Sequence, residues 1–164
     1  GGGVILNQIH EIDYLMYLFE NYKFQIVNTF NTKFSQAKID TEDTLSSNLI
    51  LTNSKEKFIV TLLLNSYERP KHRNLKIIGS KGKIVADLSK NRLEIFRYKT
   101  FKNEMMRSKK ILRKNINFKL NRNDLFKNEV YYFIKSIKTN KPIDHKYGLA
   151  KSIKDLELAL KLKK

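Results

Sequence analysis

The first apolar residues of the chain recur at steps of three and four, the spacing of an amphipathic helix. The positions concerned are Val4, Ile5, Ile9, Ile12, Leu15, Met16 and Phe19. We therefore predict a helix over residues 4–20. The three glycines before it fit either a tag remnant or a native loop in which backbone approaches another group closely.

The middle of the chain changes to short β-rich runs separated by turn sequences. These runs cover residues 24–34, 45–52, 58–64, 75–78, 84–88 and 93–98. The connections NSKEK, GSKG and SKNR are polar or glycine-containing and suit tight turns between paired strands. The run at 58–64 is too continuously apolar for a strand with one wet face, so we expect its second face to be buried against another subunit.

Helical spacing returns in the last third of the chain. Residues 99–121 are rich in Lys and Asn with little periodicity, which predicts a loop or irregular excursion. A helix is predicted over 122–138, capped by Asn123 or Asp124, and a last one over 147–162. The expected inward residues are Leu125, Val130, Phe133, Ile134 and Ile137 in the first helix and Leu149, Ile153, Leu156 and Leu160 in the second.

This order of elements predicts an α+β fold for residues 1–164. We expect one mixed, largely antiparallel open sheet of about six strands, with the helices packed on one face. The chain of 164 residues, with 41% hydrophobic residues and 18 aromatic ones, is long and apolar enough to form a folded core.

Composition excludes several classes of protein. Cysteine is absent, which rules out disulfides and thiolate metal sites and fits a cytoplasmic protein. No run approaches the roughly 18 apolar residues of a membrane helix, and no secretory leader is visible, so no membrane partner is expected.

The net charge of +17 suggests a nucleic-acid partner, but its make-up argues against one. Lysines number 26 and arginines 7, whereas specific base contacts rely on Arg. Residues 1–68 hold 5 basic and 8 acidic residues, and residues 69–164 hold 28 and 8. We interpret the excess as the lysine bias of an AT-rich genome and as a solvated surface, and expect no nucleic acid to bind.

Three polar residues, Asn7, His10 and Asp13, interrupt the first predicted helix at intervals of three. Residues three apart lie on adjacent turns of one face, here close to Ile9 and Met16 and therefore expected to face the core. The row is either a structural hydrogen-bond network or one wall of a site in which His10 transfers protons and Asp13 orients it. His10 and Asp13 supply two metal ligands and the sequence places no third, so we predict no metal.

The opening GGGVILNQIHEID resembles the start of the C-terminal domain in the glucose–fructose oxidoreductase/inositol dehydrogenase (Gfo/Idh/MocA) family. There a glycine-rich stretch enters a helix with a G-x-H-x-x-D-like pattern. Later segments agree in order: DTEDT at 40–44, YERP at 67–70, LKIIGSKGKI at 75–84 and FIKSIKTNKP at 133–142. The resemblance spans nearly the whole chain.

The resemblance implies an NAD(P)-dependent oxidoreductase acting on a sugar, an inositol or a nucleotide-linked sugar. It implies an acid/base role for His10 and a substrate-binding or tuning role for Asp13. Asn7 stands where many members carry Asp, and is expected to bind substrate. The family uses this domain as substrate wall and oligomer interface, so we expect a homo-oligomer formed through the open sheet face. A role in polysaccharide biosynthesis follows only by analogy with sugar dehydrogenases of AT-rich bacteria.

Two parts of the family pattern are missing from the sequence. No strand–G-x-G-x-x-G–helix unit is present, and neither is the Glu-Lys-Pro motif. We therefore expect this chain to be the second domain alone, with the N-terminal Rossmann domain absent. NAD or NADP would bind the full-length protein and not this chain, which alone would be inactive.

Two further residues are candidates for substrate binding. Tyr14 flanks the row and could reach a sugar, or could simply pack. Arg69, in the basic segment ERPKHR, could hold an anionic group such as a nucleotide-sugar phosphate, or could be solvated. The competing hypotheses are a non-catalytic sugar- or protein-binding and oligomerisation module, and a nucleic-acid-binding protein.

Overall fold

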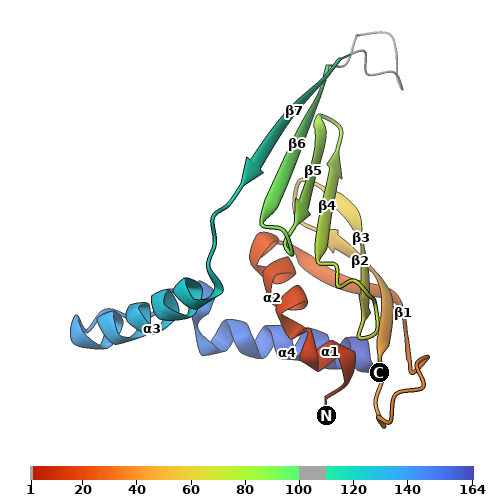
Figure 1. Cartoon of the computed structure of the whole chain (residues 1–164), viewed down its shortest axis with the longest axis horizontal. Helices are drawn as coiled ribbons and strands as arrows, with labels where there is room; N and C mark the ends of the chain where they lie inside the picture. Colours follow the sequence, from red (N-terminus) through yellow and green to blue (C-terminus); the bar gives the residue numbers. More distant parts are fainter. Residues whose placement is uncertain (1, 100–109) are drawn as a thin grey trace. The chain divides into compact units, whose positions relative to one another are not determined.

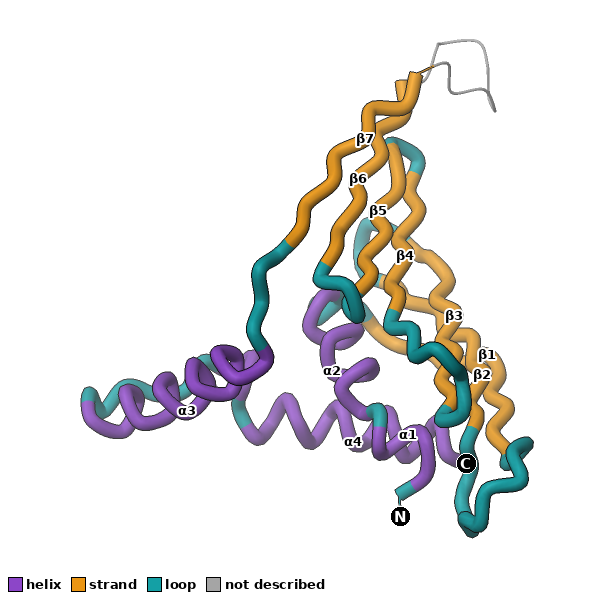
Figure 2. Tube along the Cα trace, in the orientation of Figure 1, coloured by secondary structure: helices purple, strands orange, loops and turns teal. Residues whose placement is uncertain are grey.

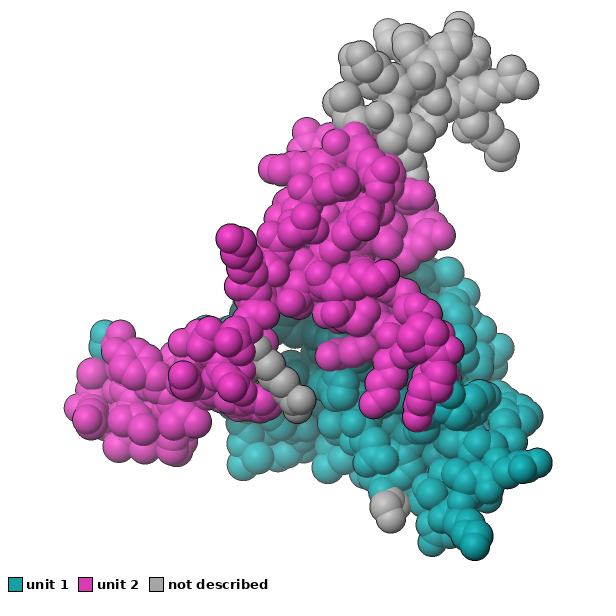
Figure 3. Space-filling view, viewed as in Figure 1, with its two compact units in different colours: residues 1–67, 140–164 teal, residues 68–139 magenta. Residues whose placement is uncertain are grey.

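The computed structural model describes residues 2–99 and 110–164, which belong to two compact units. The first unit comprises Gly1–Tyr67 and Asn140–Lys164, and the second comprises Glu68–Thr139. Figures 1 and 2 show the helices and strands, and Figure 3 colours the two units separately.

The first unit opens with two short helices, α1 (Gly3–Asn7) and α2 (Ile9–Leu18), where one helix over 4–20 was expected. Gln8 separates them because its backbone leaves helical geometry, with φ −112° and ψ 29°. Its side-chain amide donates to the backbone carbonyl of Asn65 over 2.9 Å. This contact is distant in sequence, so helical periodicity gives no sign of the break.

A three-stranded antiparallel sheet follows, formed by β1 (Lys23–Thr32), β2 (Thr44–Thr52) and β3 (Lys57–Asn65) in that order. The expected hairpin at NSKEK is present. The side-chain oxygen of Asn53 accepts hydrogen bonds from the backbone N–H groups of Lys55 and Glu56, at 2.8 and 2.9 Å. The β1–β2 register shifts between Ile26 and Asn28, where the ladder is irregular.

One face of this sheet carries the core of the first unit. The helix α4 (Leu149–Lys163), which follows the 3₁₀ turn η1 (His145–Tyr147), packs there together with α1 and α2. The buried cluster consists of Val4, Ile5, Ile12, Leu45, Leu49, Leu51, Leu64, Leu158, Ala159 and Leu162. Helices on one face of an antiparallel sheet are the layer arrangement that the element order predicts.

The prediction of which α4 residues face the core is wrong. Leu149, Ile153, Leu156 and Leu160 are 42–77% exposed, and the buried residues are instead Asp155, Leu158, Ala159 and Leu162. Both rows have helical spacing, so periodicity alone cannot choose between them. The row with the small Ala159 lies against the sheet, and the row of larger residues faces outward.

The other face of the sheet is open within the first unit. Phe30, Ile59 and Leu63 are 58–65% exposed. Between them a polar ladder links the strands: Asn48 donates to Asn28 over 3.1 Å and accepts from Thr61 over 2.8 Å. The apolar run of β3 therefore supplies residues to both faces, and the expected cover on the second face is not part of this chain's described residues.

The second unit contains a four-stranded antiparallel sheet. Its strands are β4 (Asn74–Gly79), β5 (Gly82–Asp87), β6 (Arg92–Lys99) and β7 (Lys110–Asn117), hydrogen-bonded in that order. The first three agree with the expected runs and with the turns at GSKG and SKNR.

The predicted loop over 99–121 is wrong for residues 110–117, which form β7; residues 100–109 lie outside the described part. β7 pairs with β6 from Arg92↔Asn117 to Lys99↔Lys110. Its sequence has few apolar residues, so no period-two pattern predicts a strand. Charge complementarity supports the pairing instead: Glu94 on β6 forms an ion pair with Arg113 on β7, and Arg113 and Arg92 lower the pKa of Glu94 through hydrogen bonds.

The helix expected over 122–138 is confirmed as α3 (Arg122–Lys138). Its N-cap is Asn121 rather than Asn123 or Asp124, because the Asn121 side chain accepts from the backbone N–H of Asn123 over 3.0 Å. The expected inward residues Leu125, Val130, Phe133, Ile134 and Ile137 are 43–65% exposed. The helix is therefore amphipathic, as expected, but its apolar face is uncovered.

The α+β class is confirmed, and every described strand pair is antiparallel. The strands number seven in the described residues and hydrogen-bond as sheets of three and four, rather than as one sheet of about six. Among the described helices, none has the length and apolar character needed to cross a membrane.

Candidate active site

The row Asn7, His10 and Asp13 lies at the end of α1 and along α2, and all three residues are exposed. The expectation that the row faces the core is wrong. The buried residues of α2 are instead Glu11, Ile12 and Leu15. A row of this kind is accessible to a ligand, which a buried network is not.

Glu11, which the sequence analysis did not single out, lies against His10. Its Oε1 is 3.2 Å from His10 Nε2, and its side chain is 8% exposed while that of His10 is 49% exposed. Its other carboxylate oxygen accepts a hydrogen bond from the Tyr14 hydroxyl. Glu11, rather than Asp13, is therefore the carboxylate in contact with the imidazole. The sequence signal was HEID itself, with a carboxylate directly beside the histidine.

Asp13 is held from α4. Lys151 Nζ donates to the Asp13 backbone carbonyl over 2.9 Å and also to the Asp13 carboxylate. The same ammonium lies 2.8 Å from Oδ2 of the buried Asp155. Neither Lys151 nor Asp155 could be found from the sequence, because nothing in helical spacing shows that α4 approaches α2.

The other two predicted residues have different surroundings. Tyr14 is half-buried, and its hydroxyl is engaged by Glu11. Arg69 is exposed and belongs to the second unit, where its guanidinium donates to the backbone carbonyl of Glu68 over 2.8 Å. Their roles in substrate binding stay predictions.

A cavity of about 350 Å³ adjoins Lys151 in the first unit. Its lining residues are Met16, Tyr17, Glu20, Asn21, His145, Lys146, Ala150, Lys151 and Lys154. Glu20 lies 3.3 Å from Lys146 Nζ and raises the pKa of that lysine through a hydrogen bond. The ring of Tyr147 stacks on Tyr17 with centroids 6.4 Å apart. The cavity walls thus come from α2, η1 and α4.

Gly3, in the glycine run at the start of the chain, has a structural role. Gly3 has φ +73°, and a Cβ at this position would collide with the carboxylate of Glu42. The backbone N–H of Val4 donates to the Glu42 carbonyl over 2.9 Å. Of the two readings of the glycine run, this favours the native loop that approaches another group closely.

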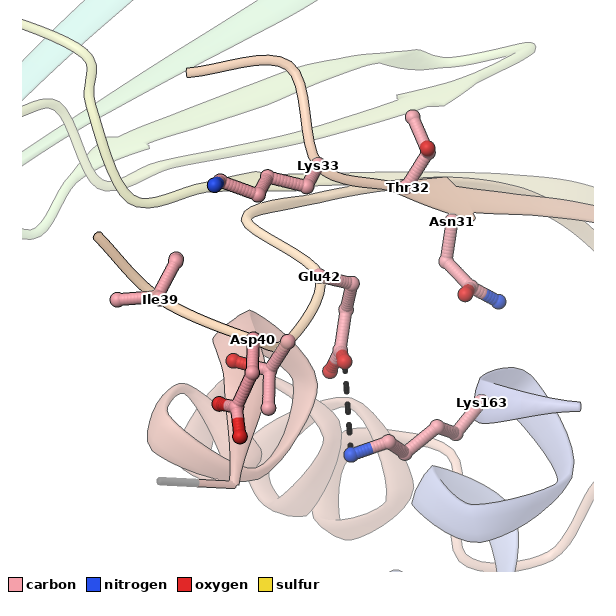
Figure 4. Close-up of a pocket in the computed structure, with 8 residues that line it drawn as sticks. Asn31, Thr32, Lys33, Ile39, Asp40, Glu42 and Lys163 are labelled. Carbon is pink, nitrogen blue, oxygen red and sulfur yellow. Dashed lines mark ion pairs between the residues drawn. The ribbon is translucent and has the colours of Figure 1, made fainter. Parts of the chain in front are cut away.

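Glu42 also lines a second cavity, of about 460 Å³, together with Asn31, Thr32, Lys33, Ile39, Asp40, Thr41 and Lys163. Figure 4 shows Lys163 reaching toward Glu42; its Nζ lies 3.4 Å from Glu42 Oε2 and donates to the Gly2 carbonyl over 3.2 Å. This contact joins the end of α4 to the start of α1.

Within the described residues, no pair of strands is parallel as in the unit that cradles a dinucleotide. Such a cradle needs parallel strands with a glycine-rich turn leading into a helix, whereas the described strand pairs are all antiparallel. Across residues 2–99 and 110–164, no three His, Asp or Glu side chains gather as metal ligands would.

Comparisons with known proteins agree with this fold. The family model described as "Oxidoreductase family, C-terminal alpha/beta domain" (Gfo/Idh/MocA) matches residues 1–148. A search of curated proteins found no match.

One solved structure with a similar fold is UDP-N-acetylglucosamine 3-dehydrogenase GnnA from Acidithiobacillus ferrooxidans. The TM-score is 0.73 at 17% sequence identity, over 98% of this chain and 47% of that one. The chain thus spans about half the length of this dehydrogenase.

Proposed function

The chain belongs to the Gfo/Idh/MocA oxidoreductase family as its C-terminal α/β domain, and on this premise we propose that it forms the substrate wall of an NAD(P)-dependent dehydrogenase. The substrate is a sugar, an inositol or a nucleotide-linked sugar, oxidised at a hydroxyl or reduced at a carbonyl. A separate Rossmann domain would hold the nicotinamide, which would supply hydride-transfer chemistry to the site. In this proposal the chain alone binds no cofactor and is inactive.

The exposed histidine backed by a buried carboxylate carries the proposal. His10 presents an imidazole to solvent, and Glu11 contacts that imidazole from the protein side. A carboxylate in this position orients the ring and stabilises its positive charge when the ring accepts a proton. His10 therefore removes the proton of the substrate hydroxyl during oxidation and returns it during reduction.

In this proposal, Asn7 and Asp13, on either side of His10, orient the substrate. Asn7 offers both a donor and an acceptor, and Asp13 offers acceptors, so together they can fix the direction of neighbouring sugar hydroxyls. Tyr14 contributes through Glu11, to which its hydroxyl donates. The similar fold of a protein named as a UDP-N-acetylglucosamine 3-dehydrogenase supports a nucleotide-linked sugar as the first substrate to try.

We expect His10→Ala in the full-length protein to lower turnover about 10²–10⁴-fold, the usual contribution of a general acid–base group. Turnover is measured as NAD(P)-dependent oxidation of a panel of sugars, inositols and UDP-sugars. The matched control is His72→Ala, which removes an exposed histidine paired with Glu68 in the second unit. A His10→Ala protein as active as the control contradicts the role of His10. Absence of turnover in wild type and both variants on every substrate of the panel favours a non-catalytic binding module.

A further inference from the structure

We propose that Lys151 is a positioning residue for Asp13: from the first turn of α4 it holds the aspartate carboxylate at the end of the exposed row, while the buried Asp155 holds Lys151. The inference rests on the proposed function, because it takes Asp13 to be part of the substrate site. It assigns a role to α4, which the family motif on α2 does not include.

The contacts of the ammonium group define its position. Lys151 Nζ meets three acceptors: the Asp13 backbone carbonyl at 2.9 Å, the Asp13 carboxylate, and Asp155 Oδ2 at 2.8 Å. An ammonium has three N–H donors, so these acceptors saturate it. Because two of them belong to one residue, Lys151 fixes the Asp13 side chain relative to the Asp13 backbone.

The cluster of Asp155, Lys151 and Asp13 has a buried side and an exposed side. The side chains of Asp155 and Lys151 are 6% and 17% exposed, whereas that of Asp13 is 55% exposed. Burial lowers the pKa of Lys151, but the hydrogen bonds to Asp13 and Asp155 outweigh it, and the net pKa is raised. Lys151 is therefore charged at neutral pH, and the carboxylate that it holds is open to a ligand.

Asp155 depends on Lys151 for its charge balance. Its Oδ1 is buried and has no hydrogen-bond partner in the described part of the chain. Burial raises its pKa, and Lys151 opposes that rise through a hydrogen bond and its charge. A buried carboxylate needs such a partner, because an unpaired buried charge is strongly destabilising.

The helix itself gains little from this lysine. A positive charge in the first turn faces the positive end of the helix dipole. Lysine four residues before an acidic residue is also the less favourable order for an ion pair within a helix. The position of Lys151 is better explained by its contact with Asp13 on α2.

The test compares variants of the full-length protein. We expect Lys151→Met to lower kcat/KM by about 10²-fold, the effect of a misplaced group in a site, and Lys151→Arg to recover part of that loss. Lys161→Met, which removes an exposed lysine of α4 instead of the largely buried Lys151, should leave kcat/KM unchanged.

A second variant separates positioning from folding. If Lys151→Met fails to fold, the double variant Lys151→Met/Asp155→Asn removes the unpaired buried charge; the folded protein should still show the low kcat/KM. A folded Lys151→Met or double variant with wild-type kcat/KM overturns the inference. Lys151 then only stabilises the fold, through its ion pairs. If His10→Ala is also fully active, the proposed function fails as well; if His10→Ala is inactive, only the role of Lys151 fails.

Discussion

At the scale of single residues, the sequence predicts which residues form the row Asn7, His10 and Asp13, but it does not predict their surroundings. The spacing of Asn7, His10 and Asp13 was sufficient to select them as one group. Their exposure, and the contact of His10 with Glu11, depend on the backbone turn at Gln8 and on packing against the sheet. The spacing of residues along the sequence contains no information about that turn or that packing.

Gly3 provides a prediction at this scale. Its φ of +73° is costly for any residue with a Cβ, and the Cβ would also collide with Glu42. We expect Gly3→Ala to lower the free energy of unfolding by at least about 1–3 kcal/mol, the cost of a strained non-glycine backbone. Urea unfolding of the chain measures it.

The control for this prediction is Gly79→Ala, where φ is not positive and an added Cβ would lie 3.9 Å from the Gly82 carbonyl oxygen. It should change the unfolding free energy by much less. Equal effects of the two substitutions would show that Gly3 is not constrained by Glu42.

At the scale of elements, the connection between β1 and β2 is held by one carboxylate. Asp43 accepts hydrogen bonds from the backbone N–H groups of Phe34 and Ser35, at 2.9 and 2.8 Å. Burial works against ionisation of Asp43, but hydrogen bonds from Ser35 and Phe34 bring its pKa down to about 2. Asp43 is thus ionised in the folded chain at a pH where an ordinary aspartate is protonated.

This lowered pKa predicts acid-sensitive stability. The stabilisation by Asp43 is present above about pH 4, the ordinary aspartate range, and is lost as the pH falls toward about 2. Asp43→Asn should be less stable than wild type at pH 7, and its unfolding free energy should vary less between pH 4 and 2. Urea unfolding at several pH values measures both; parallel curves for the two proteins would contradict the assignment.

Elements with strong periodicity could be predicted, and those that depend on partners could not. The bounds of α3, and of β2 and β3 with their hairpin, follow from apolar spacing and turn residues. The strand β7 is recognisable only beside β6, since its support includes the ion pair between Glu94 and Arg113. The inward face of α4 was misassigned because the helix carries apolar residues on two sides, and only packing selects Leu158, Ala159 and Leu162.

At the scale of the whole molecule, the open sheet face of the first unit is the feature that this chain leaves uncovered. The face carries three exposed apolar side chains, those of Phe30, Ile59 and Leu63. It also carries a polar strip whose side chains hydrogen-bond to one another: Asn28, Asn48 and Thr61. Exposed apolar patches of this kind mark interaction surfaces. We propose that the face joins copies of the protein into a homo-oligomer.

Light scattering after size-exclusion chromatography tests this proposal. The 19.4 kDa chain should elute with at least twice that mass, and Leu63→Glu should shift it to the monomer by placing a charge in the contact. Leu120→Glu, which changes an exposed leucine outside the sheets, serves as the control. A wild-type monomer, or an oligomer unaffected by Leu63→Glu, would argue against this face.

We propose that His10 transfers a proton in a dehydrogenase reaction, and chemical rescue by imidazole is the sharpest test of that role. NAD(P)-dependent turnover of full-length His10→Ala is measured with increasing imidazole, beside wild type. We expect a large loss of turnover that imidazole partly restores in a concentration-dependent way, without raising wild-type turnover. Turnover of His10→Ala close to wild type, with no response to imidazole, would contradict it.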